Sequence, residues 1–237
     1  MEPNKYFESV IKDRSKERDI DISNELAKRE VDTIFFLLKN FYGINFTGTN
    51  NTVVDIGCGD GYLSEFFEKR GFSYKGYDIG DLNIEKDRID REDNSVDLVI
   101  NIGLIEALGN IENLIKESKR ILKKGGIFYT LTPNWQKDYK NFYNNPIHKT
   151  PLTPNSLQQI LTSMYEFNNV QVFPGLRCKP KWYYSGKLKF EKAYYLLPFN
   201  QYAHVKERSL YKRSLIRDLI PDFLKGHSRS VIAIAKK

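Results

Sequence analysis

The apolar positions of this chain repeat with two periods, one typical of strands and one typical of helices. Short apolar runs bounded by glycine, proline or acidic residues predict strands at residues 53–56, 73–77, 96–102, 127–132, 168–172 and 230–235. Helical stripes predict helices at residues 25–40, 62–69, 111–124 and 154–164. Strands that alternate with helices in this way indicate an α/β fold with a doubly wound, mostly parallel sheet.

The residues at the ends of the predicted helices agree with these assignments. Ser23 precedes the first helix, Asn110 precedes the third, and Thr153 with Pro154 begins the fourth. Gly71 is a natural end for the second helix. We expect the pair Gly125-Gly126 to stop the third helix before its strand begins.

Two stretches interrupt the alternation. Residues 79–94 are too short for a helix, a strand and a second helix, so the third unit of a complete doubly wound sheet is abbreviated. Residues 135–154 form a long loop after a core strand, and loops of that length are commonly functional. This loop carries His148, which makes it a place to look for acid–base chemistry.

A glycine-rich stretch follows the first predicted strand. Asp55 lies at the carboxyl end of the strand, and Gly57, Gly59 and Gly61 follow at alternate positions. The dinucleotide fingerprint needs its third glycine three residues after the second, where this chain has Tyr62. NAD and FAD are therefore poor fits, and an ordinary strand–turn–helix joint is the simplest alternative.

The alternating glycines resemble the first motif of class I S-adenosylmethionine (SAM)-dependent methyltransferases. The resemblance implies SAM as the cofactor and a Rossmann-like methyltransferase fold with a seven-stranded sheet. In such a fold the helices before the motif act as a lid on the cofactor or simply pack on the sheet. The backbone at Gly57 and Gly59 would pass close to the amino acid tail of SAM, and Asp55 would accept a hydrogen bond from its ammonium group.

The same resemblance assigns further residues to the cofactor. Asp78 lies 17 residues after Gly61, at the end of the second strand, where one carboxylate can accept from both ribose hydroxyls; the alternative is a turn residue. Asp81 and Glu85 are candidates for the adenine contact, with a solvated loop acid as the alternative for each. We assign the Cys58 side chain no chemistry of its own. The implied cofactor-binding set is Asp55, Gly57, Cys58, Gly59, Gly61, Asp78, Ile79, Asp81 and Asn101.

Departures from the family pattern narrow the range of reactions that the chain is expected to catalyse. Relatives often have Leu-Glu-His where this chain has Ile105-Glu106-Ala107, so one candidate base is missing. The chain also lacks the Asn-Pro-Pro-Tyr-like run that holds a flipped base, and the Pro-Cys nucleophile for cytosine carbon. His148 is then the candidate catalytic base or substrate ligand, and a structural histidine bonded to the loop backbone is the alternative.

Composition and charge bound the class of protein. The 237 residues, 41% hydrophobic and 28% charged, predict a soluble globular domain with an appended lobe. Two cysteines form neither a disulfide framework nor a metal site, the first residues contain no apolar leader, and no apolar run approaches membrane-spanning length. We therefore expect a cytoplasmic protein, with a helical cap at residues 1–50, a core at 51–174, an insertion at 175–229 and a last strand at 230–237.

The predicted insertion is basic and aromatic. Residues 177–229 hold 13 Lys and Arg against 4 acids, a net +9 in a chain whose total is +7. Such a segment suits nucleic acid, an anionic membrane surface or a phosphorylated substrate, and a solvated lobe with a small aromatic core is the alternative. Because the base-holding motif is missing, we expect no specific nucleic acid partner but allow peripheral contact with anionic membranes.

The sequence thus predicts a SAM-dependent methyltransferase that modifies a hydroxyl or amine of a small molecule. A phosphorylated or lipid-linked sugar of a surface-glycan pathway is the first candidate acceptor, on a moderately specific resemblance of residues 145–157 to methyltransferases of such pathways. An RNA-directed methyltransferase and a non-catalytic SAM-binding protein are the alternatives. The sequence leaves the oligomeric state open.

Overall fold

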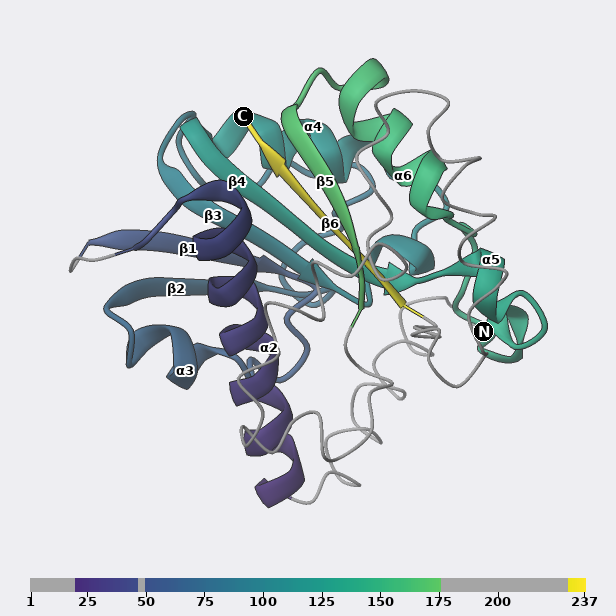
Figure 1. Cartoon of the computed structure of the whole chain (residues 1–237), viewed down its shortest axis with the longest axis horizontal. Coiled ribbons are helices and arrows are strands. Elements are labelled where there is room, and N and C mark those ends of the chain that lie inside the picture. The colour runs from purple at the N-terminus through teal and green to yellow at the C-terminus, as the bar shows by residue number, and fades with distance from the viewer. Residues whose placement is uncertain (1–19, 47–49, 176–229) are drawn as a thin grey trace. The chain divides into compact units, whose positions relative to one another are not determined.

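A computed structural model describes residues 20–46, 50–175 and 230–237 of the chain (Figure 1). The predicted insertion therefore lies outside the described residues, apart from Gly175, as does the whole segment before residue 20. The chain divides into two compact units, which are described separately below. The first comprises Met1–Ile102 and Asn110–Phe128, and the second comprises Gly103–Gly109 and Tyr129–Lys237.

The first unit is built on parallel strands. Its strands are β1 (Asn51–Ile56), β2 (Phe72–Tyr77), β3 (Val96–Ile102) and the first part of β4 (Leu122–Pro133). β1 pairs in parallel with both β2 and β3, and the register sets Asp55 opposite Gly76 and Ile56 opposite Tyr77. Val53, Val54 and Ile56 are buried, as expected of a strand in the middle of a parallel sheet. The carboxyl ends of β1 and β2 consequently lie next to each other.

Among the described residues of this unit, three helices accompany these strands, and aromatic side chains join two of the helices to the sheet. The helices are α2 (Ile20–Tyr42), α3 (Ser64–Glu68) and α4 (Glu112–Ile121). Phe35 of α2 meets Phe67 of α3 with ring centroids 5.9 Å apart and Phe72 of β2 at 5.5 Å. Such edge-to-face and tilted contacts add to the burial of apolar area. They fix the N-terminal helix beside the segment that contains the glycine stretch (Figure 1).

The second unit contains the rest of β4 and an antiparallel pair of strands. β5 (Asn168–Pro174) pairs antiparallel with β6 (Ser230–Lys236), as predicted for the last two strands. After β4 come α5 (Trp135–Asp138), the short 3₁₀ turn η2 (Phe142–Asn144), α6 (Pro154–Gln159) and the π-helical turn η3 (Ile160–Met164). The side chain of Thr153 accepts a hydrogen bond from the Ser156 N–H and completes a capping box, which confirms the predicted start of this helix.

The strands form one sheet in the order β2-β1-β3-β4-β6-β5. The described residues therefore contain six strands rather than the seven expected. The missing strand belongs to the abbreviated unit, because residues 78–95 form turns instead. Arg120 of α4 holds this segment by donating to the carbonyl oxygens of Ile89 and Arg91. Side-chain hydrogen bonds thus replace strand pairing over these residues.

Three predicted helix boundaries are wrong. The helix α2 begins at Ile20 rather than at residue 25, so Ser23 lies inside the helix and does not precede it. The helix α4 ends at Ile121, and β4 begins at Leu122, so Gly125 and Gly126 lie inside the strand and do not stop the helix. Leu122 is fully buried with extended backbone, and the Lys123 ammonium binds the Asp97 carboxylate of β3 at 2.8 Å. These contacts favour an earlier start of the strand. The helix after the glycine stretch begins at Ser64 rather than at residue 62.

No helix in the part of the chain that the structure describes has the length and apolar content needed to span a membrane.

Candidate functional site

The glycine stretch forms a loop between β1 and α3 in the first unit. The N–H of Gly57 donates to the carbonyl of Tyr77 at 2.7 Å, so the loop leaves β1 while still bonded to the end of β2. The N–H of Gly61 donates to the carbonyl of Cys58 at 3.0 Å and closes a tight turn. The loop therefore sits at the carboxyl ends of two neighbouring parallel strands, which is where ligands bind in open α/β sheets.

The loop backbone needs glycine and leaves space around it. Gly59 and Gly61 have φ of +59° and +73°, in the left-handed region that other residues rarely adopt. A Cβ placed on either residue would meet no heavy atom within 4 Å. The glycines at these two positions are thus required by the backbone conformation rather than by packing against the protein, and a ligand can approach the loop closely.

Asp78 ties the glycine loop to the end of β2. Its Oδ2 atom accepts a hydrogen bond of 2.7 Å from the N–H of Gly59, and its Oδ1 atom accepts one of 2.7 Å from the N–H of Ile79. Each carboxylate oxygen has a second lone pair, so these bonds do not exhaust its capacity to accept. Asp78 is half-buried, which leaves part of the carboxylate accessible to a ligand.

Asp55 lies beneath the loop and is almost completely buried, with 2% exposure. The hydroxyl of Tyr74 donates to its Oδ2 atom at 2.7 Å. Burial raises the pKa of Asp55 from its ordinary value of 3.8 to about 7; the bond from Tyr74 opposes the rise, and the nearby carboxylates of Glu30 and Asp78 add to it. Asp55 therefore titrates close to neutral pH.

Glu30 brings the N-terminal helix into this acidic cluster. Its buried carboxylate accepts a hydrogen bond from the hydroxyl of Tyr62, the residue directly after Gly61. The cluster also acts on the loop thiol: burial, together with the nearby carboxylates of Asp55 and Asp78, raises the pKa of Cys58 to about 12. The thiol consequently stays protonated at neutral pH, which agrees with assigning it no chemistry.

The other predicted cofactor residues differ in how far they are exposed to solvent. Asp81 is exposed, and its carboxylate accepts from the N–H of Asp78 at 3.2 Å. Glu85 accepts from the N–H of Asn110 at 2.9 Å, which joins the turn segment to the start of α4. Asn101 is fully buried near the end of β3. Of this group, Asp81 and Ile79 lie beside Asp78, whereas Glu85 has a bond typical of a structural residue.

His148 belongs to the second unit, and both of its ring nitrogens are bonded within its own loop. Nδ1 lies 2.8 Å from the carbonyl oxygen of Phe142, and Nε2 lies 3.1 Å from the side-chain nitrogen of Asn145. A carbonyl can only accept, so Nδ1 carries the proton and Nε2 keeps its lone pair. This is the neutral tautomer that a general base requires, and Nε2 is at present satisfied by the Asn145 amide.

A buried carboxylate lies at the start of the same unit. Glu106 is 3% exposed and accepts a hydrogen bond of 2.9 Å from the Thr132 hydroxyl at the end of β4. Its backbone carbonyl accepts from the N–H groups of Lys149 (2.7 Å) and Thr150 (3.0 Å). The residue that remains from the family's Leu-Glu-His pattern therefore anchors the chain immediately after His148.

Sequence reasoning did not find Glu30, Tyr62 or Tyr74. For Tyr74 a signal was present: it stands two residues before Gly76 on β2, so both lie on the same face of the strand, and Gly76 is opposite Asp55. The hydroxyl of Tyr74 can therefore reach diagonally to the carboxylate. The Glu30–Tyr62 bond joins residues 32 positions apart and has no local signal.

Comparison with known proteins gives one family and several relatives. A family described as "Methyltransferase domain" matches residues 25–172. A curated relative, the ubiquinone biosynthesis O-methyltransferase of Pelagibacter ubique, is 34% identical over 103 residues, which cover 36% of this chain and 43% of the relative. The chain thus spans less than half of that protein's length.

Solved structures give the same fold. A SAM-dependent methyltransferase from Archaeoglobus fulgidus superposes with a TM-score of 0.53 at 23% identity, over 87% of this chain and 94% of that one. Phosphoethanolamine N-methyltransferase 2 of Haemonchus contortus, solved with phosphomonomethylethanolamine and S-adenosylhomocysteine (SAH), superposes with a TM-score of 0.52 at 16% identity, over 87% of this chain and 52% of that one.

Proposed function

The chain belongs to the methyltransferase domain family, and we propose that it is an enzyme that transfers the methyl group of SAM to a hydroxyl or amine of a small molecule. The single observation that carries this proposal is the glycine loop, held by Asp78 at the carboxyl ends of β1 and β2. Curated relatives described as O-methyltransferases support a hydroxyl acceptor.

The residues at the loop fit SAM in charge and in space. SAM carries a sulfonium and an ammonium cation, and the carboxylates of Glu30, Asp55 and Asp78 surround the loop. The open space at Gly59 admits close approach of the ligand to the backbone. We assign the ribose hydroxyls to Asp78 and the ammonium to Asp55, whose ionised form the cation would favour. Ile79, Asp81 and Asn101 complete the proposed cofactor side.

When bound, SAM supplies an electrophilic methyl group for in-line displacement by the acceptor oxygen or nitrogen. The protein aligns the acceptor and removes its proton, and alignment alone can supply much of the acceleration. We propose His148 as the general base. Its Nδ1–H bond to the Phe142 carbonyl orients the ring, and Nε2 would exchange the Asn145 amide for the acceptor hydroxyl.

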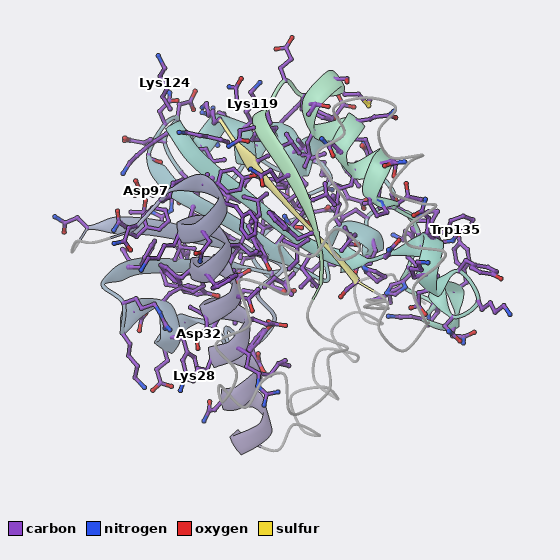
Figure 2. The ribbon with its side chains drawn as sticks, in the orientation of Figure 1. Lys28, Asp32, Asp97, Lys119, Lys124 and Trp135 are labelled. Carbon is purple, nitrogen blue, oxygen red and sulfur yellow. The ribbon has the colours of Figure 1, made fainter. Side chains whose placement is uncertain are left out.

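For the acceptor we propose a ring-containing small molecule, with a phosphorylated or lipid-linked sugar as first choice. After β4 three aromatic side chains are exposed, Trp135, Tyr139 and Tyr143, at 37%, 54% and 60% (Figure 2 labels Trp135). Trp135 and Tyr139 lie near each other, with ring centroids 6.3 Å apart. Exposed aromatic faces of this kind stack on sugar or aromatic rings. The basic charge of residues 177–229 suits a phosphate group or an anionic membrane surface.

The test is transfer of a labelled methyl group. The protein is incubated with methyl-labelled SAM and separate pools of sugar nucleotides, lipid-linked sugars, phenolic compounds and RNA, and each product is fractionated. We expect the label in a small-molecule pool. The label should be retained after treatment with mild acid, because the bond of a methyl ether is stable under these conditions. Label in RNA would favour the RNA-directed alternative. Binding of SAM without label in any pool would favour a non-catalytic binding protein.

A further inference from the structure

The acidic cluster under the glycine loop contains a carboxylate that comes from outside the core of the fold. Glu30 lies on α2, 25 residues before Asp55, and is 6% exposed. It contributes with Asp78 to the electrostatic environment of Asp55. Two tyrosine hydroxyls donate into this cluster, Tyr62 to Glu30 and Tyr74 to Asp55. The loop thus has three carboxylates around it, from α2, β1 and the end of β2.

The bond between Tyr62 and Glu30 fixes the position of this charge. Tyr62 follows Gly61 directly, so its hydroxyl is part of the segment that leaves the loop toward α3. The donor orients the Glu30 side chain, and the packing of Phe35 on Phe67 and Phe72 holds the helix that bears it. A charge held in a buried setting acts over a longer distance than one exposed to water.

We propose that Glu30 is a specificity-determining residue that makes the site prefer the sulfonium cation of SAM over the neutral thioether of SAH. This inference rests on the proposed function, because it concerns the same cofactor. SAM and SAH share the adenosine, the ammonium and the carboxylate, and differ by one methyl group and one positive charge. The negative charge of Glu30 stabilises that extra positive charge. This attraction is lost once the methyl group has been transferred, because SAH has a neutral sulfur. The preference therefore helps the product leave.

Calorimetric affinities for SAM and SAH test the proposal. In Glu30→Gln the affinity for SAM should fall about tenfold, the effect of one charge acting at the effective dielectric of a protein surface, while the affinity for SAH changes by less than about twofold. Tyr62→Phe keeps the charge and removes only the bond that orients it, so the ratio of the two affinities should change less than it does in Glu30→Gln. An equal loss for both ligands in Glu30→Gln, or no loss for either, would overturn the proposal.

Asp32→Asn is the matched control. Asp32 lies on the same helix, is exposed and pairs with Arg70 in the turn after α3, and the change removes the same charge (Figure 2 labels Asp32). It should leave both affinities within about twofold of wild type, since exposed charges are screened. A loss of the SAM preference in Asp32→Asn equal to that in Glu30→Gln would show that the effect is not specific to Glu30 and would overturn the proposal.

A further measurement uses only the wild-type protein and therefore remains possible if the Glu30→Gln variant does not fold. In sinefungin a carbon atom that bears an ammonium group replaces the sulfur, so the ligand carries a positive charge next to the position of the SAM sulfonium. Wild-type protein should therefore bind it more tightly than SAH by about fivefold or more. Affinity for sinefungin equal to or weaker than that for SAH would overturn the proposal. If wild-type protein binds neither SAM nor SAH, the proposed function itself fails. If it binds both, and the ratio of the two affinities is the same in wild type and Glu30→Gln, only this inference fails.

Discussion

Tyr74 donates a hydrogen bond of 2.7 Å to Asp55, a carboxyl group that is 2% exposed. The pair joins the first two strands of the sheet directly beneath the glycine loop. The bond favours the ionised form of Asp55, whereas burial favours the neutral form and is the larger effect. A carboxyl group whose pKa is about 7 in the folded protein and 3.8 in its ordinary state makes stability depend on pH.

The first prediction concerns that dependence. Between pH 4 and pH 7 the folded protein binds more protons at Asp55 than the unfolded chain does, so the contribution of Asp55 to stability falls as the pH rises through this range. The difference in free energy of unfolding between wild type and Asp55→Asn should shift by up to about 4 kcal/mol over this range. Urea unfolding at each pH measures it. A difference that stays constant from pH 4 to pH 7 would contradict the assignment.

The second prediction concerns Asp78. Asp78→Ala removes the acceptor for the Gly59 N–H and the proposed partner of the ribose, so the free energy of SAM binding should weaken by about 1.5 to 3 kcal/mol. Isothermal titration calorimetry gives the affinity. Asp60→Ala, in an exposed acid of the same loop, is the control and should change the binding free energy by less than about 0.5 kcal/mol. Equal affinities in wild type and Asp78→Ala would refute the ribose assignment.

The third prediction separates the two readings of His148. If Nε2 accepts the proton of the acceptor, His148→Ala should lower kcat by about 100-fold or more while the SAM affinity stays the same. Asn145→Ala removes the amide that now occupies Nε2 and should leave kcat within a few-fold. Normal turnover in His148→Ala, together with a lower melting temperature, would show that the ring serves only to hold residues 142–148.

The fourth prediction concerns the turn segment that replaces a strand. Arg120 donates to two carbonyl oxygens of that segment and pairs with Glu117 at 2.7 Å, and this pair is largely shielded from water. Arg120→Ala should lower the free energy of unfolding by about 3 kcal/mol, because it leaves Glu117 and the carbonyls without this donor. Lys116→Ala, which breaks an exposed ion pair with Glu112 on the same helix, should cost less than about 0.5 kcal/mol. Equal unfolding curves for the two variants would contradict the role of Arg120.

The sequence predicted the elements that depend on local chemistry. The start of the last helix at Thr153 follows from its capping residues, and β1 with its glycine turn follows from a short apolar run and a backbone that only glycine adopts easily. The end of α4 was misplaced because the choice between helix and strand at Leu122 depends on burial and on Lys123 pairing with Asp97 of β3. Neither contact can be predicted from the residues that are adjacent in sequence.

In the candidate site, too, the sequence predicted the residues with a local pattern and missed those that depend on tertiary contacts. Asp55 and Asp78 were predicted as site residues because each lies at the carboxyl end of a predicted strand, a feature of the local pattern. Their partners were not: the Tyr74 and Tyr62 hydroxyls and the Glu30 carboxylate meet the loop only after the strands have paired and α2 has packed. The roles of the predicted residues therefore depend on groups that the sequence pattern did not single out.

The pairing of β1 and β2 also sets Gly76 against the glycine loop. A Cβ added at Gly76 would lie 2.6 Å from the sulfur of Cys58, closer than such atoms approach in proteins. The two positions consequently share one small volume, and each limits the size that the other can have. In evolving sequences this predicts a compensating exchange: a relative with alanine or serine at position 76 should carry glycine at position 58, whereas a side chain at both positions should push the loop away from β2.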